Sequence, residues 1–419
     1  MFGMNGKSLA RTMRRRVAIT GMGLVTPHGI GKAATWTKTL AGESSIRPIT
    51  LFDTGGYRSK CAGQLAELPP VSWRRCRASR VDRASRILYH AAAEAWQESG
   101  IRVEEWDPAR AAVALGTTLG GMTSGERYHA AYLRKGPDRA RASKVLDHLA
   151  HLQPLRLMEE LGLAGVPRVF SNACASGANA VGYGFRAVRD GSADLALCGG
   201  YDPLCEFVFA GFHALQALTS GVCRPFDRNR SGLIIGEGAG ILVLEAWERA
   251  SSRGACILGE VVGYGESNDA FHMTRPDPEG KVAAAAVRRA LADAAITPDL
   301  VDYVNAHGTG TPFNDAAETA ALHAALGPRG REVPVSSIKS MIGHLLGGAG
   351  AVEGIVTVLA LGARMLPPNA NYETPDPACN LRIVRTAERP ERMRVALSNS
   401  FGFGGANATL VFRAVGADS

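Results

Sequence analysis

Short, fully apolar runs alternate along the chain with segments in which apolar residues recur every three or four positions. The runs at 111–116 and 193–199 are short and end at glycine, which is typical of strands buried on both faces. Residues 82–99 instead have helical spacing, with one apolar face made of Ile87, Leu88, Ala91, Ala92, Ala95 and Trp96. Strands that alternate with helices predict an α/β fold whose sheets are covered on both faces.

The same pattern predicts the remaining elements. Further strands are expected at 16–19, 166–170, 241–245, 257–264, 303–306, 333–336, 394–399 and 409–413. Further helices are expected at 31–42, 178–188, 207–218, 247–253, 280–295, 315–326 and 350–364. The glycines of Gly21-Met22-Gly23 mark the exit from the first strand, and they lack the third glycine of a dinucleotide-binding loop.

The order of elements is similar on the two sides of residue 255, which suggests two related halves. We expect an N-terminal half at 15–255 and a C-terminal half at 256–419. Residues 1–14 are basic, and no apolar signal core follows them, so we expect a disordered N-terminal extension.

The composition is that of an ordinary globular protein. The chain has 419 residues, of which 46% are hydrophobic and 21% charged, enough for two packed halves. We see no apolar run of 18 residues and therefore expect no membrane span. The eight cysteines show neither CxxC pairs nor histidine-ligand spacing, which argues against structural zinc and a disulfide framework and favours the reducing cytoplasm.

The net charge of +8 raises the question of the partner. No zinc-finger, RNP-type or basic-zipper pattern is present, so we expect no nucleic acid and instead an acidic protein partner on a basic surface. Solvated helix faces are the alternative explanation of the basic residues. Two groups are the candidates: Arg74, Arg75, Arg77, Arg80, Arg83 and Arg86, and then Arg127, Arg134, Lys135, Arg139, Arg141 and Lys144.

The stretch Ser171-Asn172-Ala173-Cys174-Ala175-Ser176-Gly177 lies between a predicted strand and a predicted helix. A cysteine at this point lies near the first N–H groups of the helix, which favour the thiolate, the nucleophilic form. Most free cysteines are simply buried, however, and the motif alone leaves both interpretations open.

Three more motifs follow predicted strands in the second half. His307 lies in Asn305-Ala306-His307-Gly308-Thr309-Gly310-Thr311, at a strand end, where α/β sheets place ligand sites. Lys339 and His344 lie in Ser336-Ser337-Ile338-Lys339-Ser340-Met341-Ile342-Gly343-His344, and the glycine-rich loop is residues 398–407. A surface lysine and a tight hairpin are the simpler interpretations of Lys339 and of that loop.

Together these motifs form a set suited to acyl transfer through a thiolate. Cys174 would accept an acyl group, the imidazoles would donate hydrogen bonds, and loop amides would complete an oxyanion hole. No metal-ligand set is expected, and the GxSxG motif of serine hydrolases is absent.

With the four motifs in this order, the chain resembles the β-ketoacyl-acyl-carrier-protein synthases of the type II, long-chain condensing class. The resemblance extends from about residue 15 to 412. It implies the thiolase fold, in which two pseudo-symmetric halves build a five-layer αβαβα arrangement. It also implies a homodimer, or a heterodimer with a related subunit.

The resemblance also implies roles for individual residues. Cys174 would take the acyl chain, and His307 and His344 would promote decarboxylation of the malonyl thioester. Lys339 would position the His344 loop, with Glu318 as the structural acid near it. The amides of Cys174 and Phe403 would form an oxyanion hole, and Phe403, next to Gly402, would also act as a gate. Thr309 and Thr311 would bind the phosphopantetheine arm. The acyl pocket would be lined by Leu119, Phe212 and Leu346.

The implied reaction is a decarboxylative Claisen condensation that extends an acyl group on a carrier protein, in fatty acid or type II polyketide synthesis. Phosphopantetheine enters on the carrier protein, and no tightly bound cofactor is expected. A non-catalytic chain-length factor is the alternative, but such subunits lack the nucleophile that Cys174 supplies.

Other relatives fit less well. A thiolase would need a second cysteine near residues 398–407, and the starter-condensing enzymes have asparagine where His344 stands. The aromatic-rich stretch 205–213 and Arg275 depart from the expected pattern, and they leave the acyl chain length and the pathway open.

Overall fold

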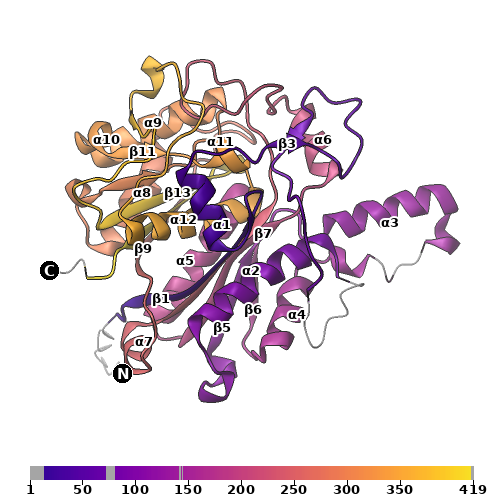
Figure 1. Ribbon diagram of the computed structural model, residues 1–419, viewed down its shortest axis with the longest axis horizontal. Coiled ribbons are helices and arrows are strands. Elements are labelled where there is room, and N and C mark those ends of the chain that lie inside the picture. Colours follow the sequence, from indigo (N-terminus) through magenta and orange to yellow (C-terminus); the bar gives the residue numbers. More distant parts are fainter. Residues whose placement is uncertain (1–13, 72–80, 141–142, 144, 417–419) are drawn as a thin grey trace, which may run out of the picture.

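The computed structural model describes residues 14–71, 81–140, 143 and 145–416 (Figure 1). Nearly all of the predicted N-terminal extension therefore lies outside the described residues. The strands are β1 (Val17–Thr26), β2 (Gly29–Ile30), β3 (Arg47–Pro48), β4 (Cys61–Ala62), β5 (Ala111–Gly116), β6 (Pro167–Phe170), β7 (Leu195–Asp202), β8 (Gly238–Ala246), β9 (Gly259–Asn268), β10 (Tyr303–Asn305), β11 (Pro334–Ser336), β12 (Arg382–Ile383), β13 (Val395–Phe401) and β14 (Ala406–Arg413).

The predicted helices are present to within a few residues, and α3, α4, α10 and α11 are additional to those given above. They are α1 (Lys32–Leu40), α2 (Arg83–Ser99), α3 (Met122–Lys135), α4 (Leu152–Leu161), α5 (Ser176–Arg189), α6 (Glu206–Ala214), α7 (Trp247–Ser252), α8 (Lys281–Ala294), α9 (Pro312–Leu326), α10 (Arg329–Glu332), α11 (Lys339–Ile342) and α12 (Ala349–Ala363).

The large sheet repeats one strand order in its two parts. From its centre outward, the first part runs β1-β8-β7-β5-β6, and the second runs β9-β14-β13-β10-β11 with β12 at the edge. The two parts join where β1 pairs antiparallel with β9. In the first part β5, β6 and β7 are parallel to one another, and in the second part β10, β11 and β13 are parallel to one another.

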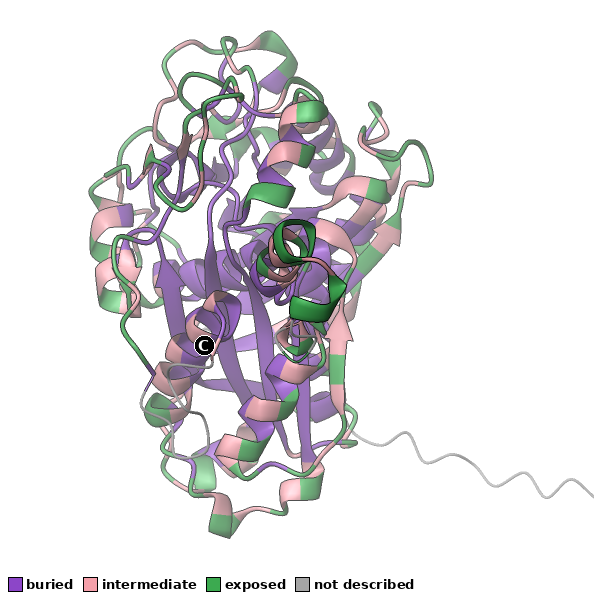
Figure 2. Cartoon of the chain, turned by 90° about the vertical axis from the view of Figure 1, so that its right-hand side faces the viewer, coloured by how far each residue is buried: buried purple, intermediate pink, exposed green. Residues whose placement is uncertain are grey.

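Helices form three layers around the two parts of the sheet. Helix α2 packs on β1 and β8, and α8 packs on β9 and β14, so these helices cover the outer faces. Helices α5 and α12 contact each other and strands of both parts, and they form the middle layer. The strands between these layers are buried, as Figure 2 shows. This arrangement confirms the predicted αβαβα thiolase fold.

Glycines bring the two middle helices into close contact. A Cβ added at Gly177 of α5 would lie 2.7 Å from the carbonyl oxygen of Gly347, and one added at Gly350 of α12 would lie 2.8 Å from the nitrogen of Ala178. Only residues without a side chain allow this approach. The loops that precede the two helices are thereby held next to each other.

Two sequence expectations need correction. The first strand does not end before Gly21-Met22-Gly23 but continues to Thr26, and a Cβ at Gly21 or Gly23 would collide with the backbone of α2. The glycines therefore do not end the strand, and instead allow α2 to pack closely against it. An 18-residue apolar stretch does exist, at Leu346–Ala363, but 83% of it is buried in the middle layer, as expected of a core helix.

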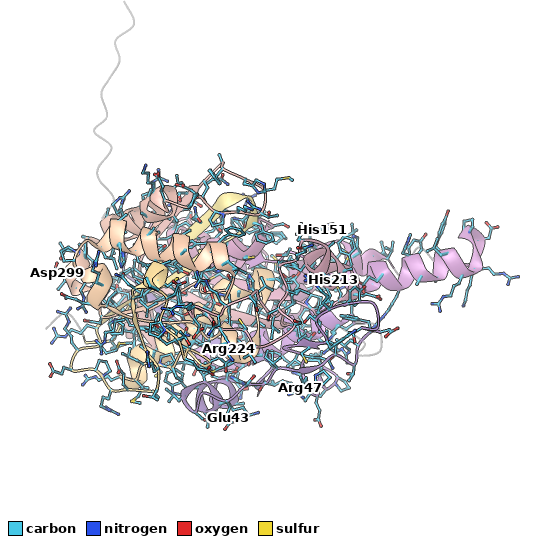
Figure 3. The ribbon with its side chains drawn as sticks, turned by 90° about the horizontal axis from the view of Figure 1, so that it is seen from above. Glu43, Arg47, His151, His213, Arg224 and Asp299 are labelled. Atoms are coloured by element: carbon cyan, nitrogen blue, oxygen red, sulfur yellow. The ribbon has the colours of Figure 1, made fainter. Side chains whose placement is uncertain are left out.

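The two basic groups differ in exposure. Arg127, Arg134, Lys135 and Arg139 are exposed on or just after α3, which projects from the body of the molecule (Figures 1 and 3). In the other group, the guanidinium of Arg83 binds the buried carboxylate of Glu237, so Arg83 is not free for docking. Arg74, Arg75, Arg77, Arg80, Arg141 and Lys144 lie outside the described residues.

Candidate active site

Cys174 lies in a single 3-10 turn, Ala173–Ala175, between β6 and α5. Ala173 has a φ of 54°, a left-handed conformation that is uncommon for a residue with a side chain. The turn is closed by Ser176, whose hydroxyl donates to the Ala173 carbonyl (2.6 Å) and accepts from the Asn172 N–H (3.0 Å). The sulfur is thus placed just before the first turn of a middle-layer helix, as the sequence predicted.

The acidity of this thiol differs from the expectation. Burial raises the pKa of Cys174 to about 11, while the positive charge of Lys339 and a hydrogen bond from the Phe403 N–H act in the opposite direction. The position before a helix suggested a stabilised thiolate, but that inference did not include the loss of solvent around the sulfur. In this structure Cys174 is a protonated thiol at neutral pH.

His307 follows β10, and hydrogen bonds hold both its backbone and its imidazole ring in place. Its N–H donates to Glu318 Oε1 (2.8 Å), and its carbonyl accepts from Lys339 Nζ (2.5 Å). Lys339 Nζ also lies 3.5 Å from His307 Nδ1. Because an ammonium can only donate, Nδ1 is the acceptor and the proton of the neutral ring is on Nε2.

His344 follows α11 and has the same tautomer as His307, but a different hydrogen-bond donor fixes it. Its Nδ1 accepts from the Leu346 N–H (3.3 Å), so its Nε2 carries the proton. Among the described residues, His344 Nε2 is buried without a hydrogen-bond partner. Burial lowers the pKa of both histidines well below the usual value, and the charge of Lys339 lowers it further. Both imidazoles are therefore neutral hydrogen-bond donors.

The two histidines and the cysteine converge on one point. The Cys174 sulfur and one ring nitrogen of each histidine all lie within 4.8 Å of one another, and the imidazole rings are perpendicular, with their centres 5.3 Å apart. A histidine that binds a metal normally donates from its other ring nitrogen. Here Nδ1 of His307 accepts from an ammonium and Nδ1 of His344 accepts from an amide, so both tautomers fit hydrogen-bond donation from Nε2.

Lys339 pairs with a buried acid that the sequence analysis did not name, whereas Glu318 lies near Lys339 as expected. Lys339 Nζ binds Glu353, a buried residue of α12, and the burial of Glu353 raises its pKa to about 7. Glu318 instead accepts from the N–H groups of His307 and Gly308 (both 2.8 Å) and holds that loop. The ammonium of Lys339 contacts His307, and its positive charge also acts on His344, whose pKa it lowers. The signal for Glu353 was its position as the single charged residue in an apolar helix, because a buried charge needs a partner.

Asp202 is a second residue that the sequence analysis missed. At the end of β7, its carboxylate accepts from the N–H groups of Thr118, Leu119 and Gly347 and from the Thr117 hydroxyl. Burial raises its pKa to about 6. Gly347 comes shortly after His344, so Asp202 connects a loop of the first half to the histidine loop of the second. An acid that ends an otherwise apolar strand was its only signal.

The glycine-rich loop closes over Cys174. It is the short turn between β13 and β14, in which the Phe403 N–H bonds the Cys174 sulfur and the Phe403 ring stacks on Phe212 at 5.5 Å. A Cβ at Gly402 would lie 3.1 Å from the Cys174 nitrogen. The two amides predicted to form an oxyanion hole are therefore adjacent, and Gly402 leaves the space in front of one of them open.

A cavity of about 270 Å³ leads to these groups. Cys174, His307, His344, Gly402, Phe403 and Phe212 line its inner part. Thr309 and Thr311, whose hydroxyl oxygens lie 2.9 Å apart, line it as well, together with Arg275, which stacks over the exposed ring of Phe313 (4.7 Å).

Two predicted pocket residues do not line this cavity. Leu119 and Leu346 are buried in the apolar cluster that lies behind Phe212. Phe403 packs against the same cluster. Phe212 and Phe403, whose rings stack on each other, line the cavity and also contact this cluster.

Comparison with known proteins matches most of the chain to one family. Residues 14–250 match the N-terminal domain of β-ketoacyl synthases, and residues 258–373 match their C-terminal domain. The 3-oxoacyl-[acyl-carrier-protein] synthase 2 of Synechocystis is 38% identical, covering 97% of this chain and 99% of that protein. The tetracenomycin polyketide synthase ketoacyl synthase alpha subunit of Streptomyces glaucescens is 39% identical, covering 96% and 98%.

Solved structures agree. The ishigamide ketosynthase/chain length factor has a TM-score of 0.91 at 36% identity, and the comparison covers 96% of this chain and 100% of that one. A ketosynthase in complex with its type II polyketide acyl-carrier protein has a TM-score of 0.88 at 32% identity, with the same coverage. The fold, the paired domain matches and these relatives agree with one another, and the chain belongs to the β-ketoacyl synthase family.

Proposed function

We propose that the chain catalyses a decarboxylative Claisen condensation. An acyl group held on Cys174 reacts with malonyl-acyl-carrier protein to give a β-ketoacyl-carrier protein and carbon dioxide, in fatty acid or type II polyketide synthesis. The observation that carries the proposal is the convergence on one buried thiol of two neutral imidazoles whose Nδ1 atoms both accept hydrogen bonds.

The first step is acyl transfer. The Cys174 sulfur attacks the carbonyl carbon of the incoming thioester, and the N–H groups of Cys174 and Phe403 stabilise the negative oxygen that forms. The bond to the carrier sulfur then breaks, and the proton of the Cys174 thiol leaves with the departing thiol. Phe403, stacked on Phe212, is proposed as the gate that turns aside for the acyl chain.

The second step creates the carbon nucleophile. When a malonyl thioester loses carbon dioxide, negative charge builds on its carbonyl oxygen, and Nε2–H of His307 and of His344 donate to that oxygen. The resulting carbanion attacks the acyl carbonyl on Cys174. Collapse of the intermediate breaks the carbon–sulfur bond, and Cys174 leaves as a thiolate that takes a proton from solvent to regenerate the thiol. Neither histidine has to accept a proton, which agrees with their strongly lowered pKa values.

The substrate arm and the partners complete the proposal. Phosphopantetheine on the carrier would extend past Thr309 and Thr311, which line the cavity. An acidic carrier protein would dock on the exposed basic residues of α3. We further propose that the boundary between the two halves lies near residue 255, and that the chain forms a dimer with a second copy or with a related subunit. We also propose that it acts in the cytoplasm, where the free cysteines of the described residues would stay reduced.

Intact-mass measurement of acyl transfer tests this function. The wild-type protein, incubated with an acyl-carrier protein, should gain the mass of the acyl group, and Cys174→Ala should gain none. Cys256→Ala is the matched control, because Cys256 is an exposed thiol that is not among the residues lining the catalytic cavity, and this variant should be acylated like the wild type.

Two results would contradict the proposal. An adduct that persists in Cys174→Ala would assign the nucleophile to another residue. A folded wild-type protein that gains no acyl group from any donor would favour the non-catalytic chain-length-factor role instead.

A further inference from the structure

Helix α6 extends the catalytic cavity as a row of aromatic rings. Phe209 and Phe212 are three residues apart and therefore lie one above the other on one face of the helix. Phe212 lines the cavity and stacks on Phe403. Phe209 lies one turn deeper, is fully buried and is not among the described residues that line the cavity.

The far side of Phe209 is occupied by two more rings. Its ring centre lies 5.5 Å from that of Phe52 and 5.3 Å from that of Tyr57, which meets it edge to face. Both residues belong to the segment between β3 and β4, and Figure 1 shows β3 beside α6. The Tyr57 hydroxyl donates to Glu206 (3.2 Å), so this segment is anchored to the helix.

An acyl chain on Cys174 has one apolar direction in which to extend. The mouth of the cavity carries the hydroxyls of Thr309 and Thr311 and the charge of Arg275. Away from the mouth, Phe212 lines the cavity and belongs to the apolar cluster that also contains Leu119, Leu346 and Phe209. Burial of hydrocarbon is favourable only in the second direction, because a chain directed to the mouth would remain in water or meet polar groups.

We propose that Phe209 is the residue that ends the acyl pocket and restricts the acyl group on Cys174 to short chains. Once Phe403 turns away from Phe212, the chain enters the apolar cluster and meets the ring of Phe209. That ring cannot move aside, because Phe52 and Tyr57 hold its far side and protein cores are close-packed. The inference rests on the proposed acyl transfer to Cys174, and it supplies the chain length that the sequence left open.

The test compares acylation by donors of different length. Wild-type protein, Phe209→Leu and Phe209→Ala are each incubated with butanoyl-, octanoyl- and dodecanoyl-carrier protein, and the rate of adduct formation is followed by intact mass. We expect the wild type to prefer butanoyl over dodecanoyl by about tenfold or more. Phe209→Ala should raise the ratio of the dodecanoyl rate to the butanoyl rate by about tenfold, with Phe209→Leu in between.

Phe185→Leu is the matched control. Phe185 is also a buried phenylalanine, but it belongs to α5 and to a different apolar cluster from that of Phe209. Its substitution should not change the ratio of dodecanoyl to butanoyl rates. If Phe209→Ala does not fold, as judged by circular dichroism, the ratio measured for Phe209→Leu decides.

The outcomes separate this inference from the proposed function. The inference is overturned if the wild type accepts dodecanoyl as fast as butanoyl, or if both Phe209 variants change all three rates by the same factor. In either case the adduct on Cys174 still supports acyl transfer. The absence of any adduct from folded wild-type protein with all three donors overturns both.

Discussion

The two halves of the molecule carry equivalent loops that supply opposite chemistry. In the first half, β6 leads through the turn with Cys174 into α5, and in the second half, β11 leads through His344 into α12. Each loop contains one residue with a side chain in the left-handed region, Ala173 and Leu346, both with a φ of 54°. In the proposed function, the sulfur of the first loop holds the acyl group and the N–H of the second binds the malonyl oxygen. Acyl transfer would then depend on the first loop and decarboxylation on the second.

The largest expected effect separates these two steps. In His344→Ala, one of two donors to the malonyl carbonyl is lost, so we expect release of carbon dioxide and condensation to fall by about a hundred- to a thousandfold. Acylation of Cys174 should persist, because its oxyanion hole is built from backbone amides. Carbon dioxide release and intact mass, measured on the same samples, check both statements. His344→Asn retains an N–H donor and should recover part of the lost rate of decarboxylation. An equal loss of acylation in His344→Ala would refute the assignment of acyl transfer and decarboxylation to different loops.

A smaller effect is expected where the second half touches the nucleophile. Gly402→Ala would place a Cβ 3.1 Å from the Cys174 nitrogen and 3.3 Å from the Ala175 nitrogen, within the space of the oxyanion. We expect the acylation rate of Cys174 to fall by about ten- to a hundredfold while the chain stays folded. The rate is measured with a saturating acyl donor.

Gly362→Ala is the control for Gly402→Ala. No heavy atom lies within 4 Å of a Cβ added at Gly362, in the last turns of α12. This change should leave the rate unaltered and raise the free energy of unfolding by about 0.5–1 kcal/mol, because alanine is the better helix former. An unaltered rate in Gly402→Ala would show that the Cys174 amide does not stabilise the oxyanion.

The smallest expected effect is on stability as a function of pH. The folded state resists protonation of His344, since burial lowers its pKa well below 6.5, whereas the unfolded chain takes up that proton below about pH 6.5. The stability contributed by the neutral ring is present above that pH and is lost as pH falls.

Urea unfolding of the wild type and of His344→Asn at several pH values checks the direction of this pH dependence. Below about pH 6.5 the wild type should lose about 1.4 kcal/mol more per pH unit than the variant. Glu318 and Glu353 act in the opposite direction, because burial raises the pKa of each to about 7, but both proteins contain them. Parallel pH dependences would mean that His344 is solvated in the folded state.

The sequence was sufficient for the elements and for the central constellation, because short apolar runs ending in glycine and one-sided helices are local patterns. It was insufficient for contacts between distant segments. The pairing of Lys339 with Glu353 and the bridge from Asp202 to Gly347 join residues that only tertiary packing brings together. The pKa of Cys174 was misjudged for the same reason, since the solvent exclusion that raises it is a property of the assembled site.

The glycine contact between α5 and α12 has a consequence for how new specificities can arise. The two loops that carry the chemistry are fixed to each other by the interior of the molecule, whereas Phe209 belongs to α6, outside that pair. Substitutions in α6 and in the segment that covers it can therefore change which acyl groups are accepted without altering the distance between the thiol and its two donors. Evolution and engineering can vary substrate range here while the reaction itself is conserved.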